Sequence, residues 1–478
     1  MPPRRIVPIL VLLATLGLHA LLFALDRAPV PRRLWGDEIL YADLAERAAR
    51  GEPAEIELLW PPLYPRLLAL AARAGPLLSE PAGVPPGTTP ARAVGRARAL
   101  VVSVQLALLA AAALSLRVVA RRLTGSARVA DAAAALFLLD PQLAAFAHYL
   151  WPETLHLALF LGVLALLTRP RREPAACAGA GLLLGVALLT KSLLQPFVPI
   201  LVAPLVGRSG LRRAGAVVAL AALVIAPTVL SNGRRHGAYT VADSALFNLW
   251  VGLNDRAPRN FQDEIVGQEL LRWRASAATF HERNALLAGR VEALVRERGP
   301  ARLLGDQLGR QYYRLFGAPS FLDDQLPGGA IAAQGYGYVG PPAWAAGLLR
   351  LWSQAHYALL LAAAAFGVWL LPWRRRDTRA TSEADDGAIE NGRAWLLVAA
   401  AFIAYNLALL LFLHVKTRYR VPLLPFFDLA AAAAWVALAA RLAPARADAT
   451  ALPRPGRRGL AAGALLAALL LKLAFLPG

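Results

Sequence analysis

The chain has 478 residues, of which 57% are hydrophobic and 17% are charged. A soluble chain carries about 25% charged residues, so this composition excludes an ordinary soluble enzyme, and the single cysteine, Cys177, excludes a secreted scaffold held by disulfides. The net charge of +20 would suit nucleic-acid binding, but the arginines lie between apolar runs rather than on one face, so no nucleic acid is expected as a partner.

Apolar runs that approach the length of a membrane span, about 20 residues, recur along the whole chain. The runs are continuous, which suits helices and not the alternating pattern of a β-barrel. We therefore predict an all-α polytopic membrane protein with about 11 transmembrane helices, several of them short. The runs are Ile6–Leu25, Leu100–Val119, Val129–Ala145, Leu155–Leu167, Ala175–Thr190, Leu193–Val206, Ala214–Leu230, Ala345–Leu371, Trp395–Leu413, Val421–Ala440 and Leu460–Leu476.

The arginines predict the orientation of these helices. Arg4 and Arg5 precede the first run, and every second short loop after it is basic. This is the positive-inside pattern, with the N-terminus in the cytoplasm. Leu25-Asp26-Arg27 is not a small-residue cleavage site, so the first run is expected to remain as a span. Two long segments, 26–98 and 231–344, are then expected to lie on the outer face.

The first outer segment contains two expected juxtamembrane helices. From Asp37 to Arg50 apolar and charged residues occupy opposite helical faces, which is typical of a helix lying along a membrane surface. Trp60-Pro61-Pro62 breaks the chain, and Tyr64–Ala74 forms a second short apolar helix. The N-terminal transmembrane module is expected to span residues 1–231, including this segment.

Asp37 and Glu38 form an acidic pair at the start of the first of these helices. Asp37 could be an N-cap, and Glu38 could simply favour the positive end of the helix dipole. Alternatively, an acid in a partly dry site at the mouth of a membrane bundle can serve as a general base. The residues alone leave both interpretations open.

Two ionisable residues fall near the outer ends of later runs. Lys191, in LLTKSLLQPF, either has a functional role, as ionisable residues at membrane depth often do, or marks a tight connection between helices. Glu153, after Trp151-Pro152, is placed where an acidic residue stabilises the start of a helix. His148 and His414 lack the spacing of metal ligands, so we expect no obligatory metal and no other cofactor, although a divalent ion could bind.

The second outer segment, 232–344, is expected to be rich in helix. It follows the turn-rich sequence SNGRRHGAY and continues through an amphipathic stretch, Glu264–Arg298. A polar linker, Asp377–Gly392, interrupts the C-terminal transmembrane module, 345–478, and carries no glycine-rich nucleotide-binding motif. Any chemistry is therefore expected outside, where nucleoside triphosphates are absent.

Three motifs, in this order and membrane placement, resemble a known family. They are the acidic pair followed by Pro-Pro-x-Tyr-Pro (Pro61 to Pro65, including Tyr64), ALFNLWVGLND (Ala245–Asp255), and TRYRVPLLPFFDLAAAAA (Thr417–Ala434). The chain is similar to GT-C glycosyltransferases that use polyprenyl-phosphate sugars, such as protein O-mannosyltransferases and aminoarabinose transferases acting on lipid A. The resemblance covers nearly the whole chain and implies a GT-C helical bundle.

The resemblance also implies a mechanism. Asp37 would accept the proton of an acceptor hydroxyl, Glu38 would support it, and attack opposite the leaving phosphate would invert the sugar carbon. Arg418, Arg420 and Lys191 would bind the donor phosphate, although membrane-flanking arginines also snorkel. Glu153 and Tyr64 would contact sugar or acceptor. The expected partners are a polyprenyl-phosphate sugar, a cell-envelope acceptor and the bilayer.

Other classes of membrane protein remain as alternatives. A secondary transporter or flippase usually shows internal repeats with broken helices near the midplane, and this sequence has no such repeat. A glycan polymerase or ligase of another fold would centre on a large outer loop rich in Arg and His. A scaffold without chemistry gives no reason for Lys191 or for the basic cluster Arg418–Arg420.

Overall fold

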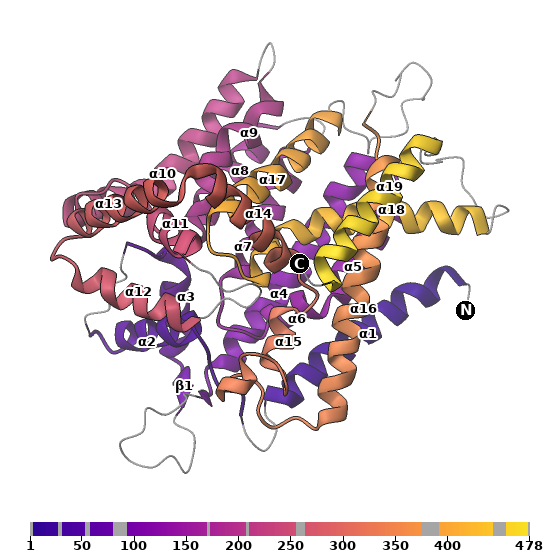
Figure 1. Cartoon of the computed structure of the whole chain (residues 1–478). Coiled ribbons are helices and arrows are strands. Elements are labelled where there is room, and N and C mark those ends of the chain that lie inside the picture. Colours follow the sequence, from indigo (N-terminus) through magenta and orange to yellow (C-terminus); the bar gives the residue numbers. More distant parts are fainter. Residues whose placement is uncertain are drawn as a thin grey trace.

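The structure is a computed structural model that describes residues 3–26, 31–52, 58–79, 93–169, 173–206, 210–254, 263–373, 392–442 and 456–476. Asp255, most of the linker Asp377–Gly392 and several arginines of the basic loops lie outside these ranges. The described chain is almost entirely helical (Figure 1). Its one sheet pairs two short antiparallel strands, β1 (Leu78–Ser79) and β2 (Ala93–Val94), with Leu78 opposite Val94.

The N-terminal half contains the expected apolar helices and both juxtamembrane helices. Its helices are α1 (Pro3–Asp26), α2 (Asp37–Ala49), α3 (Leu63–Ala72), α4 (Arg98–Thr124), α5 (Ala127–Leu139), α6 (Pro141–Phe146), α7 (Glu153–Leu167), α8 (Pro174–Thr190), η1 (Ser192–Phe197), α9 (Val198–Val202), η2 (Ala203–Leu205) and α10 (Leu211–His236).

The rest of the chain supplies a group of amphipathic helices and then the C-terminal bundle. These are α11 (Ala245–Asn254), α12 (Asp263–Ala275), α13 (Phe280–Arg298), α14 (Pro300–Phe316), α15 (Phe321–Gln325), η3 (Ala332–Gln334), α16 (Ala343–Gly367), η4 (Val368–Leu370), α17 (Gly392–Phe412), η6 (Thr417–Leu423), α18 (Leu424–Leu442) and α19 (Arg457–Phe475).

Seven helices of the described chain are long and apolar enough to cross a membrane, judged by length and composition: α1, α4, α10, α16 with η4, α17, η6 with α18, and α19. Three more of the predicted runs, at α7, α8 and η1–η2, are apolar helices of fewer residues. The prediction of an all-α, multi-pass membrane protein is therefore confirmed. Of the roughly 11 predicted spans, seven reach full length.

The helix boundaries predicted from the sequence differ from the observed ones in the run Val129–Ala145 and at SNGRRHGAY. The run Val129–Ala145 is divided between α5 and α6, because Asp140 adopts an extended conformation and its carboxylate caps α6 by accepting from the Gln142 and Leu143 backbone N–H groups. The turn expected at SNGRRHGAY is instead the last turn of α10. That helix continues to His236 and ends at Gly237, whose φ of 70° is a conformation that glycine adopts without strain.

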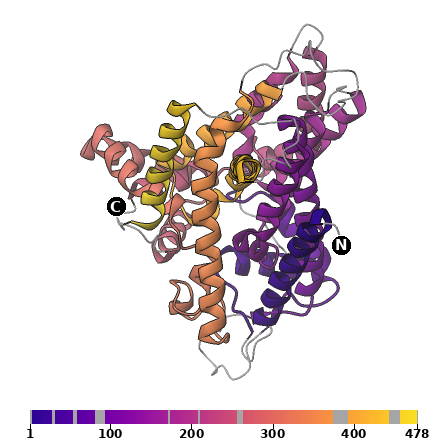
Figure 2. The ribbon, with the colours of Figure 1, turned by 90° about the vertical axis from the view of Figure 1, so that its right-hand side faces the viewer.

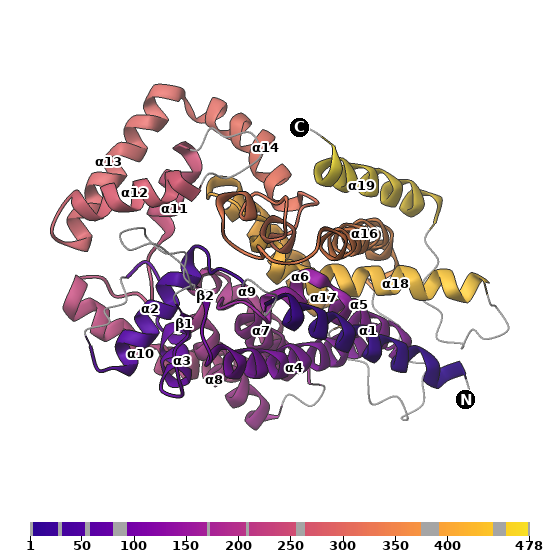
Figure 3. The same cartoon turned by 90° about the horizontal axis from the view of Figure 1, so that it is seen from below.

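The two halves of the chain pack against each other through long helices. Figure 2 shows α16–α19, in orange and yellow, beside the N-terminal helices in indigo and purple. Helix α18 contacts both α16 and α5, and α7 contacts α4 and α8. The helices α11–α14 gather on one side of the molecule, away from α1 and α4 (Figure 3). This arrangement leaves α2, η1, α11, α17 and η6 around one cavity.

The segment between α5 and α7 passes through the interior. Every residue from Asp140 to Leu157 is buried. Trp151 is 1% exposed and meets the Tyr41 and Phe321 rings edge-on. A connection with polar backbone groups can be buried only if those groups find partners, and the contacts described below provide them.

Candidate active site

One cavity of about 510 Å³ brings together four of the predicted site residues: Asp37, Glu153, Lys191 and Arg418. Its wall comes from the start of α2, the start of α7, the connection between α8 and η1, and η6. Apolar side chains of α17, one of the candidate spans, line it further, among them Phe402 and Leu410. We call this the central cavity.

Asp37 is the first residue of α2, but it is not its N-cap. The N-cap is Gly36, with a φ of 60°, and no side chain caps this helix end. The N-cap interpretation of Asp37 is therefore wrong. Instead, Arg418 Nη2 donates to Asp37 Oδ2 at 3.1 Å, and the two side chains are 11% and 31% exposed, respectively. The Asp37 carboxylate is thus presented to the central cavity with a cation beside it.

Arg418 is held in place by aromatic rings. Its guanidinium lies 4.0 Å from the centroid of the Trp151 ring and 5.1 Å from that of Tyr419. Stacking on aromatic faces orients arginine without using its hydrogen-bond donors. The guanidinium therefore faces the central cavity with donors that can clamp an oxyanion.

Glu153 and Lys191 form a second charged pair in the central cavity. Lys191 Nζ donates to Glu153 Oε1 at 2.9 Å, with exposed fractions of 21% for Lys191 and 2% for Glu153. Glu153 begins α7, and Lys191 is the extended residue that ends α8. Glu153 Oε2 and His156 Nδ1 are buried without a hydrogen-bond partner in the described structure. Buried polar atoms without partners are costly, so these two atoms are candidates for contacting a bound polar ligand.

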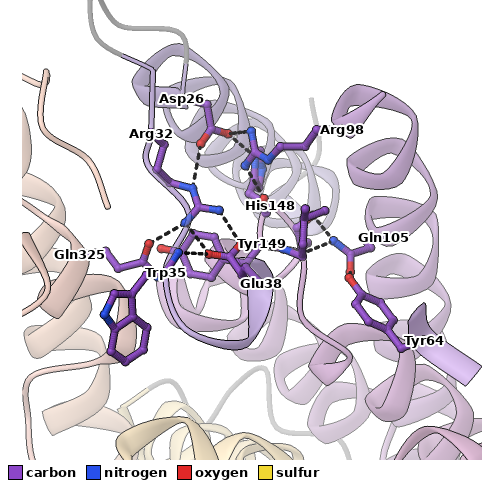
Figure 4. Close-up of polar contacts among 12 residues, drawn as sticks. Asp26, Arg32, Trp35, Glu38, Tyr64, Arg98, Gln105, His148, Tyr149 and Gln325 are labelled. Carbon is purple, nitrogen blue, oxygen red and sulfur yellow. Dashed lines mark hydrogen bonds and ion pairs between the residues drawn. The ribbon is translucent and has the colours of Figure 1, made fainter. Parts of the chain in front are cut away.

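Glu38 is turned away from the central cavity into a buried network (Figure 4). Its carboxylate accepts two hydrogen bonds from Arg32, at 2.5 and 2.9 Å, and one from the Leu150 backbone N–H at 2.8 Å. Both Glu38 and Arg32 are fully buried. Arg32 also donates to Gln325 at 2.7 Å, which joins the start of α2 to α15. These contacts give Glu38 a positioning role.

Asp26 and His148 continue this network toward α1. Asp26 pairs with Arg98 at 2.8 Å and lies 3.4 Å from His148 Nδ1, while His148 Nε2 is 3.1 Å from His19. Burial lowers the pKa of His148 even though Asp26 acts in the opposite direction, so this imidazole is neutral near pH 7. Burial and the cation of Lys416 likewise hold the pKa of His414 well below its usual value.

Metal ligands are not clustered in the part of the chain described above. No group of three or more His, Cys, Asp or Glu side chains is arranged there to hold an ion. His148 lies in the network of Asp26, whereas His414 contacts the Tyr419 hydroxyl at 3.0 Å.

Two further predicted site residues do not line the central cavity. Arg420, 1% exposed, donates to Gln142 Oε1 at 3.0 Å and to the Gly317 carbonyl at 2.5 Å, and it stacks on Tyr357 at 3.8 Å. Tyr64, 4% exposed, donates to Gln105 Oε1 at 3.1 Å. Both side chains instead connect elements within the core.

Gln105 was not singled out from the sequence, yet it serves the buried segment directly. Its amide nitrogen donates to the carbonyls of Ala147 and Tyr149, at 3.1 and 2.8 Å. Arg32, the partner of Glu38, and Trp151, on which Arg418 stacks, were also missed. A polar Gln105 inside an otherwise apolar run was the available signal, because such a residue needs a buried partner.

No family model and no curated protein matches the chain. The structure is similar to that of an apo oligosaccharyltransferase from Archaeoglobus fulgidus, with 14% identity, a TM-score of 0.45, and coverage of 98% of this chain and 55% of that one. It is also similar to ArnT from Cupriavidus metallidurans bound to undecaprenyl phosphate, with 14% identity, a TM-score of 0.37, and coverage of 97% and 88%. The chain spans about half the length of the archaeal oligosaccharyltransferase.

The chain resembles the GT-C glycosyltransferases. This is the class that its sequence motifs resemble. At 13–15% identity and TM-scores below 0.5, however, the likeness assigns no activity, lipid or acceptor to this chain.

Proposed function

We propose that the chain is a membrane glycosyltransferase that moves a sugar from a polyprenyl-phosphate donor to an acceptor hydroxyl. The central cavity carries this proposal. It combines a partly exposed carboxylate, Asp37, with two cations, Arg418 and Lys191, and an apolar wall that reaches the candidate span α17. Transfer of a sugar from a lipid-linked phosphate needs these three features. The apolar wall accommodates the lipid chain, the cations bind the phosphate, and the carboxylate can act as a base beside the sugar carbon.

In the proposed reaction Asp37 acts as the general base. The acceptor oxygen attacks the sugar carbon opposite the phosphate, and its proton passes to an Asp37 carboxylate oxygen. The bond between the sugar carbon and the phosphate oxygen breaks, and its electron pair leaves with the polyprenyl phosphate. A single displacement of this kind inverts the sugar carbon and needs no carboxylate nucleophile, unlike a retaining glycosidase.

Arg418 has two tasks in this mechanism. In the structure it is paired with Asp37, and a carboxylate engaged in an ion pair is a poorer proton acceptor. A donor phosphate would compete for the guanidinium, stabilise its own developing charge there, and leave Asp37 available to the hydroxyl. Lys191 would supply the second cation, so the proposal includes no obligatory metal.

Glu153 is proposed to contact the sugar or the acceptor. Its Oε2 is a buried acceptor without a hydrogen-bond partner among the described residues, and it lines the central cavity. Sugar hydroxyls are suitable donors for such an oxygen. Glu38 and Tyr64 would then act from behind the cavity wall, by holding α2 and α3.

The proposed setting is a bacterial inner membrane, with the N-terminus in the cytoplasm and the central cavity at the outer face. The basic loops on one side of the predicted spans support this orientation. The acceptor would be an outer-face glycolipid, polysaccharide or protein. Labelling of an engineered cysteine beside the cavity by a membrane-impermeant reagent tests this placement, and protection from that reagent in intact cells would contradict it.

The decisive experiment compares cells that lack the gene with cells complemented by the parent chain or by Asp37→Asn. Mass spectrometry of envelope glycoconjugates should reveal a sugar that the parent restores and Asp37→Asn does not. Purified protein in proteoliposomes, given the corresponding polyprenyl-phosphate sugar and the identified acceptor, should release polyprenyl phosphate, with or without a chelator. Movement of the intact sugar lipid across the bilayer without cleavage would instead identify a flippase.

A further inference from the structure

A second cavity of about 210 Å³ lies behind the wall of the central cavity, between α2, α3 and the end of α10. Trp60 lines both cavities. Helices α2 and α3 contact each other, and the residues of α10 that line this cavity come from the last turns of that helix. The polar residues of this second cavity are Arg66, Thr228, Ser231, Asn232, Arg235 and His236, and we call it the basic pocket.

The basic pocket is lined for an anion. Two arginines, Arg66 and Arg235, belong to different helices, and no carboxylate occurs among the described residues that line the pocket. The hydroxyls of Thr228 and Ser231 add further donors. Arg235 in the last turn of α10 also complements the helix dipole, but that effect gives no reason for Arg66, which comes from α3.

In the membrane orientation proposed above, the positive charge of the basic pocket lies on the side where positive charge is unexpected. Helix α10 begins after the basic loop around residue 208, so its other end, with Arg234 and Arg235, falls on the outer face. Positive charge is disfavoured on that side. A cluster of cations there is better explained by an anion that it binds.

Exposed leucines lie on both of the helices that supply the arginines of the basic pocket. Leu67 and Leu70 of α3 are 41% and 58% exposed, and Leu230 and Leu223 of α10 are 50% and 66% exposed. Leu70 lies one helical turn after Arg66, on the same face of α3, and Leu223 and Leu230, seven residues apart, share one face of α10. Exposed leucines on helices that flank a cationic pocket match a ligand with a charged head and hydrocarbon tails.

We propose that the basic pocket binds the phosphate headgroup of an anionic membrane lipid whose acyl chains lie along α3 and α10. Arg66 and Arg235 pair with the phosphate, and Ser231 donates a hydrogen bond to it. This site is separate from the central cavity and does not depend on the proposed transferase activity.

Native mass spectrometry of the detergent-solubilised chain, titrated with phosphatidylglycerol, tests the site. One lipid should bind more tightly than the rest, and more tightly than zwitterionic phosphatidylcholine. The double variant Arg66→Ala with Arg235→Ala should weaken this first binding step about 30-fold, since each cation near a lipid headgroup contributes about 1 kcal/mol. Replacing both by lysine should retain most of the affinity.

The matched control replaces two exposed arginines of other helices, Arg290 of α13 and Arg302 of α14, by alanine. Phosphatidylglycerol should bind this variant within about twofold of the parent, because those arginines lie outside the basic pocket. Equal loss in both double variants would mean nonspecific charge attraction and overturn the proposal. Unchanged binding in Arg66→Ala with Arg235→Ala, in protein that elutes and unfolds like the parent, would also overturn it.

A third arm uses inorganic phosphate alone. If the acyl chains contribute as proposed, millimolar phosphate should displace little of the bound phosphatidylglycerol. Phosphate that binds the pocket as tightly as the lipid would show a site for a free anion, and the assignment to a membrane lipid would then be wrong.

Discussion

Asp37 and Glu38 are adjacent in sequence, but the regions around them differ in solvent access and in the number of partners. Glu38 is fully buried and accepts from Arg32 and from two backbone N–H groups, those of Leu150 and Trp35. Asp37 is 31% exposed at the cavity and has an ion pair with Arg418. A fully satisfied carboxylate fixes structure, whereas one that keeps room for a further contact can do chemistry.

The helix geometry explains how neighbours reach such different surroundings. Successive residues of an α-helix are rotated by about 100°, so adjacent side chains leave the helix in different directions. At the start of α2 one direction leads to the central cavity and the other to Arg32 and the buried segment before α7. The motif that looks like a catalytic pair in sequence is therefore one cavity residue and one positioning residue.

Among the variants that test this difference between Asp37 and Glu38, Asp37→Asn is expected to have the largest effect, on the rate of sugar transfer. Loss of a general base should lower the rate of sugar transfer by roughly 10²–10⁴-fold, while thermal unfolding stays close to that of the parent. Release of polyprenyl phosphate measures the rate, and thermal unfolding in detergent measures the stability. A rate near that of the parent would remove Asp37 from the mechanism.

Glu38→Gln should mainly lower the stability of the protein and have a smaller effect on the rate of transfer, the opposite of Asp37→Asn. Removing one partner of a buried ion pair costs about 3–5 kcal/mol of stability, because Arg32 keeps its buried charge. We expect a lower unfolding temperature and reduced folded yield, with transfer per folded molecule much less affected than in Asp37→Asn. If Glu38→Gln unfolds like the parent but has lost transfer, Glu38 takes part in the reaction, and the distinction between a catalytic Asp37 and a structural Glu38 would be wrong.

Arg418→Ala should mainly weaken donor binding. Hydrogen bonds to charged groups contribute about 1.5–3 kcal/mol, so the affinity for the polyprenyl-phosphate sugar should fall roughly 10- to 100-fold. Arg418→Lys retains the charge but not the paired donors and should fall between parent and alanine. Titration of donor against transfer rate measures this, and an unchanged donor affinity in Arg418→Ala would argue for a purely structural arginine.

Tyr64→Phe is expected to have the smallest effect. It removes the hydrogen bond to Gln105 without creating a cavity, which should cost about 1 kcal/mol of stability. Transfer rate and donor affinity should remain near those of the parent, because the Tyr64 hydroxyl points into the core and not the central cavity. A large loss of transfer with normal stability would contradict this placement.

Local properties of the sequence predicted most of the secondary structure. The apolar runs coincide with helices, and the helix predicted from Asp37 to Arg50 is α2, Asp37–Ala49. The failures were also local: Asp140 before Pro141 divides one run, and SNGRRH continues a helix although its composition suggested a turn. In both cases a local cap decided the helix end and outweighed residue preference: Asp140 caps α6, and α10 ends at Gly237.

The candidate site was predicted in part. The sequence indicated Asp37 and Arg418 as site residues, but it did not distinguish Arg418 from Arg420. In the 3₁₀ helix η6, successive residues turn by about 120°, so residues two apart face different directions. Which of them faces the central cavity depends on how η6 packs, and the sequence pattern contains no such information.

The sequence by itself determined that this chain is a bundle of apolar helices and that an acidic pair begins the helix after the first one. These are consequences of composition and of helical periodicity, which act over a few turns. Only the tertiary structure decided that Asp37 meets Arg418, 381 positions away in the chain, and that Glu38 is enclosed with Arg32. Such pairings follow from the packing of whole helices, because a contact between distant segments is set by the sum of many side-chain interactions rather than by either residue alone.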